Sequence, residues 1–378
     1  MRDVFIVSAV RTPVGRKSGT LSGLNPVALA SIPLMEVVRR VDLDPALVED
    51  VVMGCVTPIG EQGGNIGRLA VLNAGWPVRV PAVTLNRMCG SSQQAIHFAA
   101  QAIAAGDMEI AVGAGIESMS RVLMGSDYPE QFYEGIPYDL IPQGLSAELI
   151  ADKWNLSRAA LDRFSYESHL KAAAATQAGH FRAEIVPVTV MKNGATVTLD
   201  YDEGFRANVE LSKIGMLRPV FKEGGKITAG SSSQISDGAS AVLLASADAV
   251  KRYNLRPRAR LVARVVVGSD PVLMLDGPIP ATRLILERTG LSIDDMDSIE
   301  INEAFASVVL AWMAEIEPDP ARVNPSGGAI ALGHPLGATG AKLMTTLLHR
   351  LERTGGRYGL QTMCIGHGMA TATIIERV

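Results

Sequence analysis

Residues 83–107 read VTLNRMCGSSQQAIHFAAQAIAAGD, and this stretch joins a strand pattern to a helix pattern. Its first residues favour a β-strand that ends at Asn86, and an Ala-rich helical periodicity begins just after Cys89. Residues 90–92, between the two patterns, are small or capping residues. We therefore predict a strand that turns into a helix at Cys89, which is the repeating unit of an α/β fold.

The same alternation of short apolar runs and Ala-rich helical periods covers residues 1–120 and returns from about residue 250 to residue 378. The two halves look architecturally alike, although no residue-level repeat proves a duplication. Prolines and aromatics interrupt the pattern in residues 126–144, and residues 156–181 predict a polar-faced helix. An Asn-Gly pair between β-favouring runs in residues 190–204 predicts a hairpin.

We therefore predict three regions. Residues 1–120 and 241–250 form an N-terminal half, residues 121–240 form an inserted loop domain, and residues 251–378 form a C-terminal half. Loops on a rigid scaffold commonly carry binding residues, so we expect substrate contacts in the insert.

The composition excludes several classes of protein. A formal charge of -4 and the absence of long like-charge runs argue against nucleic acid. The 378 residues include no apolar stretch long enough to span a bilayer, and the apolar run near the N-terminus reads as a first strand and not as an export signal. Three cysteines without CxxC spacing predict neither disulfides nor a metal site, and they favour a cytoplasmic location.

Cys89 is the first candidate catalytic residue. Unpaired N–H groups and the positive end of the helix dipole favour a thiolate at a strand-to-helix junction, and they could also bind an oxyanion. The alternative is a buried and inert thiol, which is the usual state of a lone cysteine between apolar residues.

His334 lies in the glycine-rich run GGAIALGHPLGATG, residues 327–340, where sharp turns can push a polar ring into a cleft. This run fits neither GxxxxGK[ST] nor GxGxxG after a strand, so it does not predict a nucleotide phosphate site. The ring is equally compatible with a structural or a catalytic role.

Two further motifs complete the candidates. Cys364 follows a strand-like run and enters the Gly-X-Gly turn of TMCIGHGMA, where a thiol could exchange a proton with a substrate carbon beside free N–H groups. Asn302 follows another strand-like run and either caps the next helix or positions a water.

Taken together, and in this order, the four motifs resemble those of the thiolase family over essentially the full chain. The specific matches are Cys89-Gly90-Ser91, Asn302-Glu303-Ala304-Phe305-Ala306, Gly333-His334-Pro335 and Cys364-Ile365-Gly366. The overall pattern is similar to that of bacterial degradative thiolases, among them those that act on steroid side chains. The resemblance implies two βαβαβαββ halves in a five-layered α/β body with an inserted loop domain.

The resemblance also implies roles for individual residues. Cys89 would take the acyl group as a thioester, His334 would deprotonate Cys89, and Cys364 would move the proton at the α-carbon. Asn302 would hold a water that joins His334 in one oxyanion hole, and the N–H groups of Cys89 and Gly366 would form another. The remaining implied residues contact coenzyme A (CoA) and are Ser233, Phe305 and Arg206.

The implied reaction is the cleavage of a 3-oxoacyl-CoA by CoA into acetyl-CoA and a shortened acyl-CoA, with CoA as substrate and no permanently bound cofactor. The alternatives are an acetyl-CoA acetyltransferase that forms acetoacetyl-CoA and a non-catalytic acyl-CoA-binding relative. Ketoacyl synthases use a second histidine where Cys364 stands, and papain-like proteases have another chain order. The family implies a homodimer or homotetramer, and it allows association with a β-oxidation complex.

Two segments depart from the family pattern. The final turn reads CIGHGMA where many members have a run of glycines, so His367 adds a titratable ring beside Gly366. The covering loop reads Pro142-Gln143-Gly144 where a His-Met-Gly or Met-Gly sequence is common. The missing histidine argues against an acetoacetyl-CoA biosynthetic enzyme, whereas acyl chain length and the direction of the reaction stay open.

Overall fold

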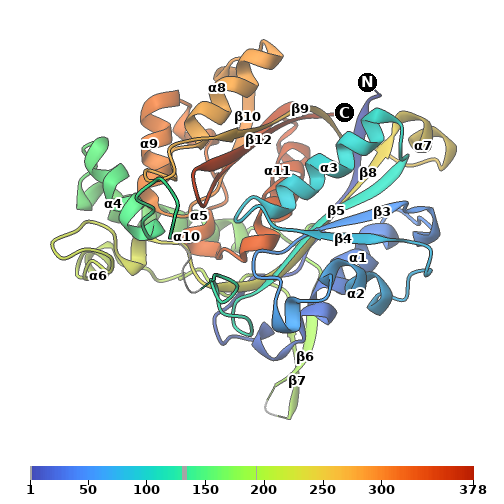
Figure 1. Ribbon diagram of the computed structural model, residues 1–378, viewed down its shortest axis with the longest axis horizontal. Helices are drawn as coiled ribbons and strands as arrows, with labels where there is room; N and C mark the ends of the chain where they lie inside the picture. Colours follow the sequence, from blue (N-terminus) through green and yellow to red (C-terminus); the bar gives the residue numbers. More distant parts are fainter. Residues whose placement is uncertain (1, 130–133, 193) are drawn as a thin grey trace.

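The computed structural model describes residues 2–129, 134–192 and 194–378. In these residues a ten-stranded sheet runs in the order β10-β11-β12-β9-β1-β8-β5-β3-β4, with β2 beside β8 (Figure 1). The strands are β1 (Val4–Arg11), β2 (Gly15–Arg16), β3 (Asp50–Gly54), β4 (Ala82–Leu85), β5 (Ile110–Ser118), β8 (Ser236–Ser246), β9 (Ala259–Gly268), β10 (Met296–Ile301), β11 (Tyr358–Ile365) and β12 (Met369–Arg377).

The two ends of the sheet repeat one topology. In the N-terminal part β3 is parallel to β4 and β5, and β8 is antiparallel to β5 and β1. In the C-terminal part β10 is parallel to β11, and β12 is antiparallel to β11 and β9. The order β1-β8-β5-β3 therefore corresponds to β9-β12-β11-β10, and a short antiparallel contact of Phe5 and Ile6 with β9 joins the two parts. The predicted likeness of the halves is confirmed at the level of topology.

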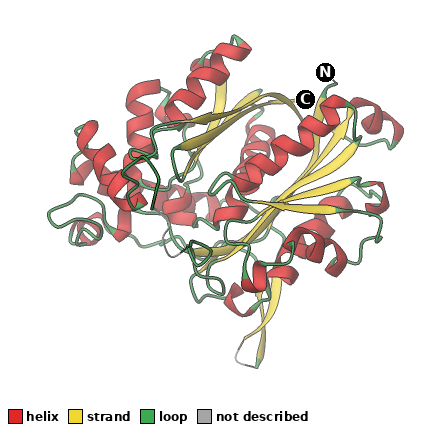
Figure 2. Ribbon diagram, in the orientation of Figure 1, coloured by secondary structure: helices red, strands yellow, loops and turns green. Residues whose placement is uncertain are grey.

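The helices complete five layers, which Figure 2 shows as alternating helix and strand. Helices α1 (Pro26–Arg39) and α2 (Ile66–Asn73) pack on the outer face of the N-terminal strands. Helices α3 (Ser91–Ala105) and α11 (Thr339–Thr354) lie side by side between the two parts of the sheet. Helices α8 (Pro278–Thr289) and α9 (Ala306–Ile316) cover the outer face of the C-terminal strands.

The segment between β5 and β8 contains α4 (Gln143–Lys153), α5 (Arg158–Gln177), the hairpin of β6 (Val188–Lys192) and β7 (Ala195–Leu199), and α6 (Leu211–Gly215). The helix predicted over residues 156–181 and the two hairpin strands are confirmed, whereas Asn193 of the predicted turn lies outside the described residues. Residues 236–240, which we assigned to the insert, form the first part of β8.

Arg11 ties this segment to the core. Its side chain is 1% exposed, and its guanidinium donates to Glu184 Oε1 at 2.7 Å and to both carboxylate oxygens of Asp202 at 2.7 and 2.9 Å. A buried arginine must be neutralised in this way, so the insert is held against β1 by charge pairing as well as by apolar packing. No helix in the described part of the chain combines the length and the apolar character needed to cross a membrane.

Candidate active site

The two central helices bring Cys89 and His334 together. Cys89 lies between the end of β4 and the start of α3 at Ser91, as the sequence predicted. His334 lies between the short helix α10 (Ala329–Leu332) and α11. Because α3 and α11 pack side by side, both residues line the same cavity of about 890 Å³.

A tight turn fixes Cys89. Met88 has a positive φ of 45°, a strained conformation for a residue with a side chain. The turn is closed by hydrogen bonds from Gly90 N to Arg87 O and from Ser91 N to Met88 O, each 3.0 Å long. The Ser91 hydroxyl also accepts from Arg87 N at 3.0 Å. The strain at Met88 is therefore stabilised locally, as is common next to catalytic residues.

The thiol of Cys89 is protonated in the resting protein. Burial raises its pKa to about 11, although the N–H groups of Gly366 and of Cys89 itself point at the sulfur and lower the pKa. The N–H groups favour the thiolate, as predicted, but desolvation outweighs them in the resting protein. Cys89 needs a base before it can act as a nucleophile.

His334 has the properties of such a base. Its Nδ1 lies 2.6 Å from the Thr339 hydroxyl, which itself donates to Pro335 O at 2.8 Å. The Thr339 oxygen must then accept from Nδ1–H, which leaves the lone pair on Nε2. Burial, together with the charge of Lys342, lowers the His334 pKa to about 3. The ring is therefore neutral at neutral pH and can accept a proton on Nε2.

Asn302 connects His334 to the second thiol. Its amide Nδ2 lies 3.4 Å from His334 Nε2 and also donates to Cys364, whose pKa is raised by burial and by the neighbouring Cys89. Helix α9 begins at Ala306, so the alternative of Asn302 as a helix cap is wrong. The structure thus brings all four motifs into one site, as the resemblance implied.

The cavity also contains two of the three residues expected to contact CoA. Ser233 and Phe305 line it, and Phe305 meets Phe221 edge to face with ring centroids 5.8 Å apart. Arg206 is exposed outside the cavity lining, and its backbone N–H donates to His169 Nδ1 at 3.1 Å. Asn302 and Cys364 are fully buried directly behind the lining.

Comparisons with known proteins agree with this geometry. The family models "Thiolase, N-terminal domain" and "Thiolase, C-terminal domain" match residues 4–248 and 255–377. The chain belongs to the thiolase family. A crystal structure of human mitochondrial 3-ketoacyl-CoA thiolase superposes with a TM-score of 0.93 at 36% identity and covers 100% of this chain and 99% of the human one. The predicted thiolase fold is confirmed.

Two curated thiolases indicate the range of relatives. The steroid 3-ketoacyl-CoA thiolase FadA6 of Mycobacterium tuberculosis is 53% identical over 100% of this chain and 95% of that protein. A β-ketoadipyl-CoA thiolase of Acinetobacter baylyi is 43% identical over the full length of both chains. The prediction that this thiolase is an acyltransferase is confirmed.

His367 lines the active-site cavity of this thiolase. It has a positive φ of 65°, and its ring centroid lies 6.2 Å from that of Tyr128, which also lines the cavity. Burial lowers the His367 pKa, so the ring is neutral at neutral pH. The ring narrows the cavity next to Gly366 without adding a charge.

Sequence reasoning missed Glu117, at the end of β5. Its Oε2 accepts from Val56 N at 2.8 Å and Gly337 N at 2.9 Å, and its Oε1 accepts from Thr57 N at 3.2 Å and Gln62 Nε2 at 2.9 Å. Burial raises the pKa of this carboxyl group. The sequence Gly115-Ile116-Glu117-Ser118, in which an acid comes near the end of an otherwise apolar strand, was the available signal.

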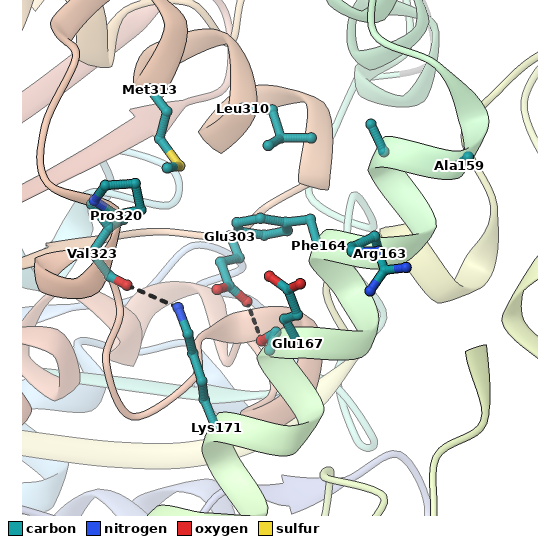
Figure 3. A pocket seen from close by; sticks show the side chains of 12 residues that line it. Ala159, Arg163, Phe164, Glu167, Lys171, Glu303, Leu310, Met313, Pro320 and Val323 are labelled. Carbon is teal, nitrogen blue, oxygen red and sulfur yellow. Dashed lines mark hydrogen bonds between the residues drawn. The ribbon is translucent and has the colours of Figure 1, made fainter.

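Glu303, which follows β10, is a second buried carboxylate near the site, and Figure 3 shows it beside Lys171 and Phe164 in a pocket. Glu303 accepts from the Ser168 hydroxyl at 2.7 Å, from Asn324 Nδ2 at 3.0 Å and from Ile330 N at 3.2 Å. Glu303 lines a separate pocket of about 510 Å³ between α5 and α9. The segment that carries His334 is therefore held near both ends by a buried carboxylate.

Proposed function

We propose that this thiolase cleaves a 3-oxoacyl-CoA with free CoA into acetyl-CoA and an acyl-CoA two carbons shorter, through a thioester on Cys89. One observation carries the proposal. A buried thiol, a neutral imidazole with its lone pair on Nε2, and a second thiol are linked through Asn302 and Gly366 beside one cavity.

In the first stage, His334 Nε2 takes the proton of Cys89, and the sulfur attacks C3 of the substrate. The reaction has two oxyanion holes. The N–H groups that point at the Cys89 sulfur form one of them. Asn302 and a water that it holds contribute to the other. The C2–C3 bond then breaks. Its electron pair passes to the acetyl-CoA enolate, and Cys364 protonates C2.

In the second stage, CoA enters beside Ser233 and Phe305 and gives its thiol proton to the Cys364 thiolate. The CoA sulfur attacks the thioester, and Cys89 leaves and recovers its proton from His334. Both thiols and the imidazole return to their starting states. The reaction therefore needs no metal and no permanently bound cofactor, and the same steps run backwards as a condensation.

Thiolysis of 3-oxoacyl-CoA substrates in the presence of CoA tests the proposal. The wild type and Cys55→Ala, which removes a buried cysteine outside the cavity lining, should turn over, whereas Cys89→Ala should neither turn over nor form an acyl adduct in intact-mass measurements. Retained acyl transfer by folded Cys89→Ala would refute the assignment of the nucleophile.

The substrate panel also separates the remaining alternatives. Turnover of acetoacetyl-CoA alone would favour an acetyl-CoA acetyltransferase, and binding of CoA without any turnover would favour a non-catalytic relative. The names of the curated relatives favour acyl groups larger than acetyl, including steroid fragments and β-ketoadipyl.

The assembly and the cellular location stay predictions from the family. We expect a homodimer or homotetramer, with association with a β-oxidation complex as a further state, in the cytoplasm. Sedimentation of the purified chain and fractionation of cells test these expectations.

A further inference from the structure

Charged side chains line the active-site cavity together with Cys89. Among the described residues that line it, three are charged at neutral pH, namely Arg16, Lys17 and Asp127. The two cations outnumber the carboxylate, and the rings of His334 and His367 are neutral because burial lowers their pKa values. The lining therefore has an excess of one positive charge.

The backbone around both cations is fixed. Arg16 belongs to β2 and pairs with Ser236 of β8, and its N–H donates to Glu203 at 3.2 Å. Lys17 N–H donates to Ile235 O at 3.2 Å. Both residues are exposed, and both line the cavity.

The part of the cavity lining that clusters with Cys89 is apolar. Val56, Met119 and Leu336 cluster with Cys89 in the core, and each of them also lines the cavity. An acyl chain held on Cys89 can bury its methylene groups against these side chains. Its far end would then lie in the same cavity as Arg16 and Lys17.

We propose that Arg16 and Lys17 select 3-oxoacyl-CoA substrates whose acyl chain ends in a carboxylate. This inference rests on the proposed thiolysis and names the substrate class for it. A terminal carboxylate gains charge-assisted hydrogen bonds from the guanidinium fork and the ammonium group, and a methyl group gains none. Asp127 repels a carboxylate placed next to it, so the favourable contacts are those with Arg16 and Lys17.

The test compares two substrates of equal length, 3-oxoadipyl-CoA and 3-oxohexanoyl-CoA, which differ in the terminal carboxylate. We expect kcat/KM to be about tenfold higher for the carboxylated substrate, because hydrogen bonds to charged groups are worth about one power of ten or more. Equal or higher kcat/KM for 3-oxohexanoyl-CoA would overturn the inference and leave the thiolase assignment intact. Failure to cleave either substrate would instead count against the proposed function.

The double variant Arg16→Gln/Lys17→Met should remove most of the preference by lowering kcat/KM for 3-oxoadipyl-CoA alone. Lys251→Met, which removes a lysine of α7 (Ala247–Arg252) outside the cavity lining, is the matched control and should keep the preference. The phosphates of CoA are the competing anions. If the double variant raises KM for CoA and lowers kcat/KM equally for both substrates, the two cations bind CoA. That result would overturn the inference.

Discussion

The Nδ1 atom of His334 lies 2.6 Å from the hydroxyl of Thr339, one turn further along the chain at the start of α11. Because Thr339 also donates to Pro335 O, its oxygen is an acceptor for the ring, and this sets which nitrogen of His334 is free to take a proton. Thr339 is therefore a positioning residue, and it acts through His334.

Thr339→Val should lower kcat for thiolysis by about tenfold, since a buried hydrogen bond to the imidazole is worth on the order of 1–2 kcal/mol. KM for CoA should change little. Thr339→Ser keeps the hydroxyl and should restore most of kcat, and a pH profile of both variants separates a change in His334 from a general loss of structure. Equal rates for the two variants would contradict this role.

Glu117→Gln should destabilise the protein and slow thiolysis. The carboxylate accepts four hydrogen bonds, whereas glutamine offers one oxygen and directs an NH₂ group at buried donors. We expect a loss of about 2–4 kcal/mol in the free energy of unfolding, measured by chemical denaturation. Glu223→Gln, at an exposed position, is the control. Unchanged stability of Glu117→Gln would show that these four hydrogen bonds do not stabilise the fold.

Alkylation of Cys89 should rise steeply with pH. The raised pKa of about 11 means that the thiolate fraction increases about tenfold for each pH unit between pH 7 and pH 10. Iodoacetamide labelling of Cys89, followed by peptide mass spectrometry, measures this rate, and acyl-CoA should protect the residue. A plateau already reached at pH 7 would mean that the resting sulfur is ionised.

Acid should destabilise the fold through buried neutral histidines. Burial, together with Arg264 and Arg87, lowers the His97 pKa to about 3, so the unfolded chain binds a proton more readily than the folded one. The stability from the neutral ring is complete above about pH 6.5 and is lost as the pH falls towards 3.

The thermal midpoint should therefore fall between pH 6.5 and pH 4. His97→Gln should fall less because glutamine does not titrate, and it can still bond the Thr373 hydroxyl that His97 contacts at 2.7 Å. His180→Gln, which changes a partly exposed ring, is the control. Parallel pH curves for the wild type and His97→Gln would contradict the assignment.

Local patterns in the sequence were enough to predict the elements that carry the site. The strand-to-helix junction at Cys89 and the long helix α5 each follow from periodicity and turn residues within one short stretch. The four motif residues were found because each stands next to such a junction.

Long-range contacts could not be predicted in this way. The short pairing of Phe5 and Ile6 with β9 joins residues more than two hundred positions apart, and no local pattern encodes it. The raised pKa of Cys89 could not be predicted for a similar reason, because the helix end is visible in the sequence and the burial that outweighs it is not. Arg206 matched a family position, yet it lies outside the cavity lining.

The repeated topology of the two halves determines where the catalytic groups lie. Equivalent helices of the two halves, α3 and α11, present their N-terminal ends to one cavity, and one end bears Cys89 while the other follows His334. A symmetric frame would offer two identical groups there, whereas acyl transfer needs an attacking atom and a proton acceptor that differ. The difference between the two catalytic groups therefore depends on two short turns that differ between halves of the same topology.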